Sequence, residues 1–425
     1  MWFNKVIQIL KLKDIRNKIL FVLGVFVVFR IMANIPIPGI DVQKLKELFA
    51  GFQFFGLLNL FTGGALENLS IVMLGLGPYI TGVIVMQLLT MIFPGLKAMY
   101  QEEGEIGRQK FNQYGRILTV PLAILQSFGL LTLLQRQQIL GALTPNLLFI
   151  SILTITAGCL FLMWLGELIS EKGIGNGISL LIFAGIVASL PGDIRQLAVS
   201  WDPSKIPSYL LFFAIALIMI VMVIMINEAR RNIPVTYAKR VRGTRLYGGS
   251  STYLPLSVNP AGVIPIIFAI SIILLPSMLA NFLTGAGGIL GNIAQSIAAF
   301  LGDIRVYGVL FFLLVVLFTY FYTAVTFDPK AISSNLQKMG GYIPGTRPGE
   351  STSKFLSYIL NRILPIGALF LGLIAVLPSV IGAATGVVVF QFLIGGTSLL
   401  IVVSVVLETV RQVKSQLQMR EYETF

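Results

Sequence analysis

The sequence has no histidine among its 425 residues and a single cysteine, Cys159, which lies inside an apolar run. A disulfide within the chain is therefore impossible, and zinc sites and other chemistry that depends on imidazole are excluded. The sequence also lacks the GxxxxGK[ST] loop that binds phosphate, so we expect no nucleotide hydrolysis by that route. We therefore predict a protein that is not an enzyme and that uses no metal or cofactor.

Charged residues are scarce as well, and at 12% they are about half as frequent as in an average soluble domain. Hydrophobic residues make up 56% of the chain, and the mean hydropathy is +0.87. Long apolar runs recur from one end of the sequence to the other, which predicts an integral membrane protein. Runs such as 209–226 are apolar on every face, so they favour helices over the alternating strands of a membrane barrel.

Ten of these runs approach the ~20 residues that a helix needs to cross a bilayer. They are residues 19–34, 71–93, 117–134, 147–165, 174–190, 209–226, 261–283, 306–327, 363–380 and 387–409. No run has a charged side chain at its centre, whereas ion-coupled carriers hold their ion with buried ionisable groups. We therefore predict an all-helical protein that crosses the membrane ten times and that is not an ion-coupled carrier.

The basic residues are distributed unequally between the two sides of the membrane. Of the 31 Lys and Arg residues, 24 lie on the side of the termini and 6 on the other side, with Arg30 inside the first run. This asymmetry predicts that both termini are cytoplasmic. Residues 1–18 are basic and amphipathic and lack a cleavage-site pattern, so we expect a retained N-terminal tail, and residues 410–425 would form a C-terminal tail. The net charge of +13 is then one-sided, which suits anionic lipids or an acidic partner.

Two long loops carry much of this cytoplasmic charge. Residues 227–259 contain six basic residues, interleaved tyrosines and strand-prone runs on both sides of Gly248 and Gly249, which predicts a hairpin that projects from the membrane. Residues 328–361 are centred on GGYIPGTRPGEST, whose glycines and prolines predict a rigid, shaped loop. Basic loops with aromatic residues bind proteins, RNA or lipid. We favour a protein or a ribosome as the partner, although composition alone does not separate these from lipid.

Small polar groups interrupt several of the apolar runs. The residues concerned are Gln87 in the second run, Gln126 and Ser127 in the third and Ser271 in the seventh. Single amides and hydroxyls of this kind usually hold two helices together by hydrogen bonds. The alternative is a seam between helices that opens, held shut by a few such bonds. Both interpretations remain open from the residues themselves.

The ten runs divide into two sets of five. Because five is odd, a duplicated five-span unit must insert in opposite orientations, and inverted repeats place the functional path at their interface. The second and seventh runs occupy equivalent places, and both open with glycine and proline before a stretch of apolar residues.

A short segment of mixed character precedes the second run on the outer side. Residues 57–75, LLNLFTGGALENLSIVMLG, combine apolar residues with a break at Gly63 and Gly64. We expect a short half-buried helix, a bend at the two glycines, and exposure of Glu67, Asn68 and Ser70 to water. Irregular backbone at membrane depth is tolerated where it lines a cavity rather than lipid.

Several segments in order along the chain resemble the bacterial SecY family, the channel-forming subunits of the Sec protein translocon. They include FRIMANIPIPGID (29–41), NLFTGGALENLSI (59–71), LGLGPYITGVIVMQLLT (74–90), YAKRVRG (237–243), NPAGVIPIIFAISIILLP (259–276), GGYIPGTRPGEST (340–352) and FLIGGTSLLIVV (392–403). The resemblance implies an hourglass pore between an N-terminal half, residues 19–190, and a C-terminal half, residues 209–409. The external loop 191–208 would be the hinge between them.

The resemblance also implies roles for individual residues. The constriction would be a ring of apolar side chains, formed by Leu76, Ile80, Ile182, Ile267 and Ile401. The lateral gate would lie between the second and third runs and the seventh and eighth runs, at Gln87, Gln126, Ser127 and Ser271. Segment 57–70 would be the plug, with Leu60, Phe61, Thr62, Gly63, Gly64, Ala65, Leu66, Glu67 and Asn68 at its centre. The cytoplasmic docking residues would be Arg240, Arg242, Arg245 and Arg347.

The family resemblance implies a channel that passes unfolded secretory polypeptides and releases hydrophobic segments into lipid. Its expected partners are the membrane subunits SecE and SecG, the ATPase SecA, the ribosome, signal sequences and anionic lipids in a bacterial inner membrane. The alternatives are a small-molecule carrier, which the missing midplane charge disfavours, and a lipid scramblase or scaffold. A scaffold would give no reason for the glycine-rich short helix or for the apolar ring.

Overall fold

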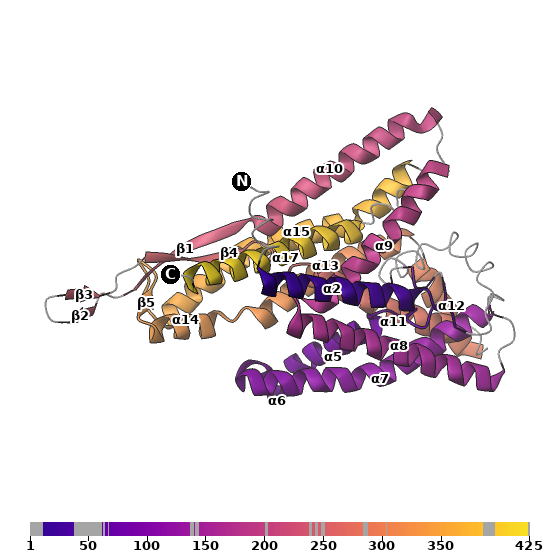
Figure 1. Ribbon diagram of the computed structural model, residues 1–425, viewed down its shortest axis with the longest axis horizontal. Helices are drawn as coiled ribbons and strands as arrows, with labels where there is room; N and C mark the ends of the chain where they lie inside the picture. The colour runs from indigo at the N-terminus through magenta and orange to yellow at the C-terminus, as the bar shows by residue number, and fades with distance from the viewer. Residues whose placement is uncertain are drawn as a thin grey trace.

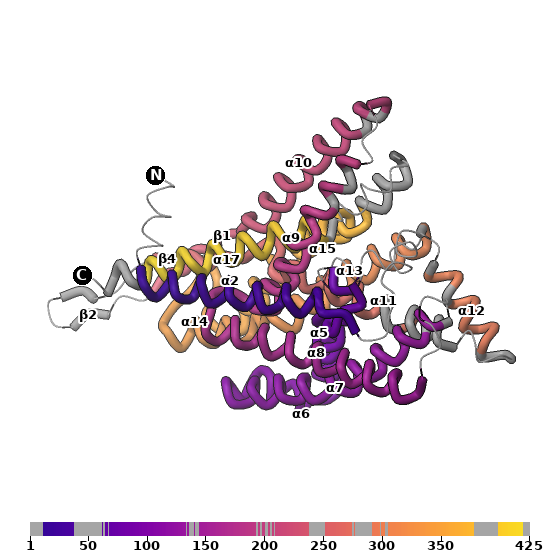
Figure 2. The backbone as a smooth tube through the Cα atoms, turned by 45° about the vertical axis from the view of Figure 1, so that its right-hand side comes forward, coloured from indigo at the N-terminus to yellow at the C-terminus, as the bar shows by residue number. Residues whose placement is uncertain are grey.

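The computed structural model describes residues 12–37, 62, 64–66, 68–136, 140, 144–199, 203–237, 240–242, 245–247, 251–283, 288–302, 304–385 and 396–423. Over these residues the chain is a bundle of long helices with a small sheet at one end (Figure 1). The start of α2 and the end of α17 lie at the same end of the bundle as the sheet (Figures 1 and 2).

Each of the ten predicted runs overlaps one helix, although residues 71–76 of the second run form turns and residues 387–395 of the tenth lie outside the described residues. In the first half these are α2 (Lys13–Ala33), α5 (Gly77–Ile92), α7 (Gly104–Arg136), α8 (Pro145–Lys172) and α9 (Gly177–Val199). In the second half they are α10 (Ile206–Glu228), α11 (Ile264–Leu283), α13 (Ile304–Thr326), α15 (Glu350–Thr385) and α17 (Gly396–Glu423). Two shorter helices, α6 (Pro94–Gln101) and α12 (Gly288–Gly302), lie between them.

Five of the described helices are long and apolar enough to cross a membrane, and the bent pair α5 and α6 would make a sixth. The two helices of this pair meet at 113°. The bend follows from Pro94, because a residue before proline avoids the helical region, and Phe93 is extended there with φ −108° and ψ 107°. The chain is thus a multi-pass helical membrane protein, whereas the total of ten crossings stays a prediction.

The packing of the helices repeats from one half to the other. In the first half α5 packs on α7, α7 on α8, α8 on α9, and α2 on both α8 and α9. In the second half α11 packs on α13, α13 on α15, α15 on α17, and α10 on both α15 and α17. These are the same pairs shifted by five spans, which is the pattern that the predicted duplication would produce. The main contacts between the halves are those of α11 with α5 and α7 and of α17 with α9.

The predicted hairpin is present within residues 227–259. Strands β1 (Arg230–Tyr237) and β4 (Ser251–Ser257) pair antiparallel along their whole lengths, and the hairpin projects from the bundle (Figure 1). At its tip β2 (Arg240–Arg242) pairs with β3 (Arg245–Tyr247). The innermost described pair is Arg242 with Arg245, so the two arms are related about residues 243–244. The prediction that the hairpin is centred on Gly248 and Gly249 is therefore wrong, because the observed register places its centre four to five residues earlier.

The second cytoplasmic loop is largely helical, which corrects the prediction of a shaped loop over 328–361. Helix α14 (Pro329–Lys338) begins where the Asp328 carboxylate accepts hydrogen bonds from the backbone N–H groups of Lys330 and Ala331. Helix α15 starts thirteen residues before the predicted span, at Glu350. The salt bridge from Lys354 to Glu350 at i, i+4 favours that first turn, and it lowers the pKa of the Glu350 carboxyl.

The two cytoplasmic loops form one folded unit, which the sequence did not indicate. Strand β5 (Gly341–Tyr342) pairs with β1, so the order in the sheet is β4-β1-β5. A separate apolar core lies between the sheet and the helices, made of Ile233, Val235, Leu256, Leu336, Ile343 and Leu356. We call residues 230–257 with residues 328–361 the cytoplasmic unit, after the side of the membrane that the charge asymmetry predicts for them.

Two other predicted boundaries differ from the structure. Helix α9 continues to Val199 and α10 begins at Ile206 after a 3₁₀ turn at Pro203–Lys205, so most of the expected hinge loop 191–208 is helical. Helix α17 continues to Glu423, well into the expected C-terminal tail. Residues 410–423 are mostly good helix formers with polar side chains, which continue a helix without giving a hydrophobic signal. The N-terminal tail lies outside the described residues up to residue 11.

Candidate pore ring, plug and gate

The five predicted ring residues come from four helical segments of both halves. Leu76 immediately precedes α5 and Ile80 lies in its first turn, while the remaining three lie on α9, α11 and α17. Leu76, Ile182, Ile267 and Ile401 all belong to the largest buried apolar cluster of the protein, with 8% exposure or less. Ile80 is half-buried and packs against the same cluster.

The ring residues are thus members or neighbours of one apolar cluster to which both halves contribute. None of the five side chains has a group that could replace the hydration shell of an ion. A constriction lined by such side chains blocks ions by excluding water.

The described part of the plug packs against this cluster from one side. Thr62, Ala65 and Leu66 are buried, and Ala65 belongs to the same apolar cluster as the ring residues. Backbone hydrogen bonds from Ala65 N to Thr62 O and from Leu69 N to Leu66 O make successive turns, and Gly64 has φ +79°. The structure therefore has a bend at the predicted place. Leu60, Phe61, Gly63 and Glu67 lie outside the described residues.

The end of the plug segment is paired with the chain that follows α2. Ile37 N donates to Leu69 O at 2.9 Å and Ile71 N donates to Ile35 O at 3.0 Å. Leu69 has φ +41°, a backbone conformation that is strained for a leucine. Ser70 is fully buried as a result, and its hydroxyl accepts a hydrogen bond from Val72 N.

The expectation that Ser70 faces water is therefore wrong. Its strand-like pairing with residues 35–37 removes it from the surface. Asn68 is half-buried and donates a side-chain hydrogen bond to Asn34 Oδ1 at 3.3 Å.

Helix α8 presses directly on this segment at Gly158. A Cβ atom at position 158 would lie 2.1 Å from the carbonyl oxygen of Ile71, so only glycine fits without a shift. The backbone of residues 69–72 is consequently held between the end of α2 and α8.

The predicted gate residues lie at the junction between α5, α7 and α11. Gln87, Gln126, Ser127 and Ser271 are all buried, and α11 packs against both α5 and α7. Within the described part of the chain, however, no hydrogen bond joins any two of these four. Ser127 donates to Ile124 O of its own helix at 3.0 Å, as hydroxyls in helices commonly do. Gln87 Oε1 is buried without a hydrogen-bond partner among the described residues.

The expectation that these four residues hold the seam shut by bonding to one another is therefore not met. A different polar contact crosses the seam, from α6 to α13. Gln101 Nε2 donates to Val325 O at 3.3 Å. Val325 lies in the last turn of α13, where carbonyl groups have no partner within the helix. Sequence reasoning missed Gln101 because its partner is a backbone atom and carries no side-chain signal.

The predicted docking arginines all belong to the cytoplasmic unit. Arg240 and Arg242 lie on β2 and Arg245 lies on β3, although their side chains lie outside the described part. Arg347 is exposed on the turn between β5 and α15. The Arg347 carbonyl accepts a hydrogen bond from Thr352 Oγ1 at 2.9 Å, which fixes the turn.

Comparison with known proteins identifies the family. Residues 70–410 match the family model described as SecY. The chain belongs to the SecY family. It is 44% identical to the protein translocase subunit SecY of Streptomyces galbus over 97% of both chains. It is 43% identical to the corresponding subunit of Corynebacterium glutamicum over 99% of both chains.

Solved structures show the same fold as this SecY family member. One is described as "The structure of a protein conducting channel", with a TM-score of 0.64, 22% identity, and coverage of 93% of this chain and 91% of that chain. Another concerns the plug domain of a SecY protein, with a TM-score of 0.64 and 21% identity over the same shares of the two chains. The helical membrane fold predicted from the sequence is therefore confirmed.

Proposed function

We propose that this protein-conducting channel of the SecY family passes unfolded secretory polypeptides through the ring of Leu76, Ile80, Ile182, Ile267 and Ile401. The observation that supports this proposal is that four of these side chains, from both halves, belong to one buried apolar cluster, with Ile80 packed against it. Ala65 of the plug segment belongs to the same cluster. A collar of Leu and Ile excludes ions by dewetting, whereas an extended chain can displace it. Such a collar has no chemical preference, which suits a substrate of varied sequence.

Hydrophobic segments leave the channel sideways, between α5 and α7 on one side and α11 and α13 on the other. Lateral release is driven by transfer of apolar surface from water to lipid, worth about 25 cal/mol per Å². The closed seam must oppose this only weakly. The lack of hydrogen bonds among the four gate residues of the described chain supports a seam of that kind. The single bond of Gln101 would add about 0.6 kcal/mol, a typical value between membrane helices.

The cytoplasmic unit is the docking surface for the partner that supplies energy, either SecA or the translating ribosome. Its three-stranded sheet joins the base of the hairpin to the loop that carries Arg347, and the tip of the same hairpin carries Arg240, Arg242 and Arg245. A solved structure of similar fold is described as Sec61 in a canine ribosome–channel complex, with a TM-score of 0.61 and 21% identity.

SecE and SecG are the proposed membrane partners, and anionic lipids would contact the basic cytoplasmic face. The membrane is the bacterial inner membrane, with both termini in the cytoplasm. The common position of the sheet, the start of α2 and the end of α17 at one end of the bundle supports this orientation.

The ring is tested by ion conductance in planar bilayers. Ile182→Gly combined with Ile267→Gly removes two side chains of the collar, and we expect a steady ion leak that the parent channel does not show. The matched control is Ile218→Gly, because Ile218 lies on α10 with its side chain 57% exposed. A double variant that is as tight as the control would refute the pore assignment.

A further inference from the structure

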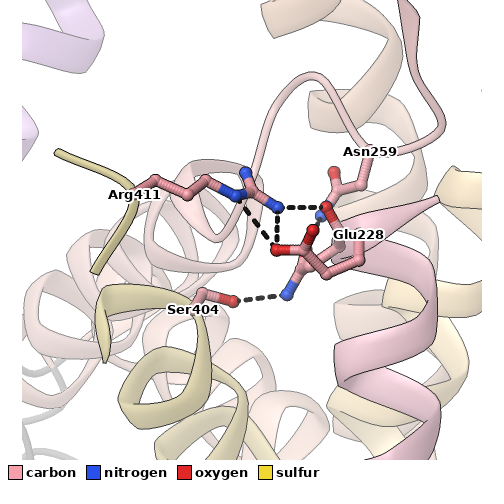
Figure 3. Close-up of polar contacts among 5 residues, drawn as sticks. Glu228, Asn259, Ser404 and Arg411 are labelled. Carbon is pink, nitrogen blue, oxygen red and sulfur yellow. Dashed lines mark hydrogen bonds and ion pairs between the residues drawn. The ribbon is translucent and has the colours of Figure 1, made fainter. Parts of the chain in front are cut away.

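Both ends of the cytoplasmic hairpin are joined to α17 by a cluster of polar side chains (Figure 3). Asn227 and Glu228 end α10 just before β1, and Asn259 follows β4. Ser404 and Arg411 lie on α17. We call these five residues the hairpin joint. They come from three separate stretches of the sequence, and of the five only Asn259 lies in one of the segments quoted for the family resemblance, as the first residue of NPAGVIPIIFAISIILLP.

Three of the joint residues form a chain of hydrogen bonds. Asn259 Nδ2 donates to Asn227 Oδ1 at 3.0 Å, and Asn227 Nδ2 donates to Ser404 Oγ at 2.8 Å. The two ends of the hairpin and α17 are thereby connected in series. Asn259 is only 7% exposed, so its hydrogen bonds are shielded from competing water.

Arg411 adds a second connection beside the first. Its Nε and Nη2 atoms donate to Glu228 Oε1 at 3.0 and 2.6 Å, and Nη2 also donates to Asn227 O at 2.8 Å. The Asn227 carbonyl lies in the last turn of α10, where it lacks a partner within the helix. The Arg411 and Glu228 side chains are 39% and 46% exposed, so the ion pair matters more for geometry than for stability.

The backbone around the joint is also tightly packed. Val258 N donates to Ala229 O at 3.0 Å, which extends the hairpin pairing down to the joint. Helix α15 contacts the same point at Gly367, where a Cβ atom would lie 2.5 Å from Val258 O. The base of the hairpin therefore has little freedom to move independently of α15 and α17.

The joint lies close to the ring residues of the second half. Ser404 follows Ile401 by three residues on α17, about 4.5 Å along the helix axis. Asn259 also donates to Gly262 O at 3.1 Å, directly before α11, and Ile267 lies in the first turn of that helix. The hairpin is thus linked within about a helical turn to two side chains of the ring.

We infer that the hairpin joint is a positioning device, with Asn227, Asn259 and Ser404 as its positioning residues. A displacement of the hairpin by a bound cytoplasmic partner moves α11 and α17 together, and with them Ile267 and Ile401. Rigid elements connected by hydrogen-bond networks are the physical means by which such coupling travels. This inference rests on the proposed role of the ring.

The first test measures whether the joint holds the hairpin to α17. Spin labels are placed at Thr252→Cys on β4 and at Ser415→Cys on α17, both exposed, while the native Cys159 is buried. Distances are measured in the full chain with its membrane partner subunits in lipid. We expect a narrow distribution in the parent and a clearly broadened one in Asn259→Ala and in Ser404→Ala.

The matched control is Thr409→Val on the same helix. Among the described residues Thr409 Oγ1 donates to Val405 O alone, at 2.7 Å, so this change removes a hydroxyl without removing a bond of the joint. Distributions as narrow in the joint variants as in the control would overturn the inference. The double variant Asn259→Ala with Ser404→Ala should resemble either single variant, because the bonds act in series; independent, additive broadening would contradict the series arrangement.

The second test measures coupling, with non-translating bacterial ribosomes as the probe. In Asn259→Ala and Ser404→Ala the affinity for ribosomes should stay unchanged. The change in ion conductance that ribosome binding causes should become at least about fivefold smaller, which is the lower end of typical coupling factors between two sites. A full conductance response in both variants would refute a positioning role. If ion conductance is the same in the parent and in the ring variants, the proposed function is refuted and not the role of the joint. The distance measurement does not depend on that outcome.

Discussion

The side-chain amide of Gln101 donates a hydrogen bond of 3.3 Å to the backbone carbonyl of Val325, 224 positions later in the chain. Gln101 is the last residue of α6, which continues from the gate helix α5, and Val325 is in the last turn of α13. The two residues belong to opposite halves of the protein. Their contact lies at the ends of the helices between which hydrophobic segments are proposed to leave.

Removal of this contact should make the gate easier to open. For Gln101→Ala we expect about threefold faster export of a precursor with a weakened signal sequence, since the bond is worth about 0.6 kcal/mol. Gln109→Ala is the control, because Gln109 is exposed on α7. The measurement is precursor translocation into vesicles. Equal rates for Gln101→Ala and the control would show that the bond does not hold the gate.

A side chain at Gly158 should displace the end of the plug segment. Gly158→Ala places a Cβ atom where the Ile71 carbonyl now lies, and overpacking of this kind typically costs about 1–3 kcal/mol. We expect a lower unfolding temperature together with an ion leak in planar bilayers. Gly24→Ala is the control, since nothing lies within 4 Å of a Cβ atom at that position of α2. Unchanged stability and unchanged conductance would contradict the tight packing of α8 on residues 69–72.

Reversal of charge at Arg347 should weaken the binding of the cytoplasmic partner. For Arg347→Glu we expect roughly tenfold lower affinity for SecA or for the ribosome, equivalent to ~1.4 kcal/mol, and a matching loss of translocation. Assembly with SecE should be intact, because the change is confined to an exposed turn. Lys354→Gln, in the same unit, is the control for a general loss of positive charge. Normal translocation by Arg347→Glu would remove this residue from the docking surface.

The sequence predicted those features that produce local signals. Long apolar runs located the ten helices, and paired strand-prone stretches located the hairpin. The start of α15 at Glu350 and the end of α17 lie outside the long apolar runs, so a search for membrane spans did not include them.

The residues whose surroundings the sequence predicted wrongly, or did not indicate, have partners far away in the chain. Ser70 is buried because the neighbouring backbone pairs with Ile35 and Ile37, and β5 could not be seen because two residues form a strand only beside β1. Gln101 and the hairpin joint use backbone carbonyls or amides that carry no pattern. The roles of the ring, the plug, the gate and the docking arginines stay predictions until the variants above are measured.

The repeated packing has a geometric consequence for the direction of opening. Helices α5 and α11 are the second spans of the two halves, and α9 and α17 are the fifth spans. In each of these two contacts, a helix therefore packs against its own counterpart in the other half. In two halves that are related by a twofold axis, contacts of this kind lie on the axis, as in an isologous dimer. The covalent connection from α9 to α10 joins the halves at a helix that takes part in the second contact. The halves are thus covalently joined beside the contact of α9 with α17 and not beside the contact of α5 with α11, so we expect them to separate at α5 and α11.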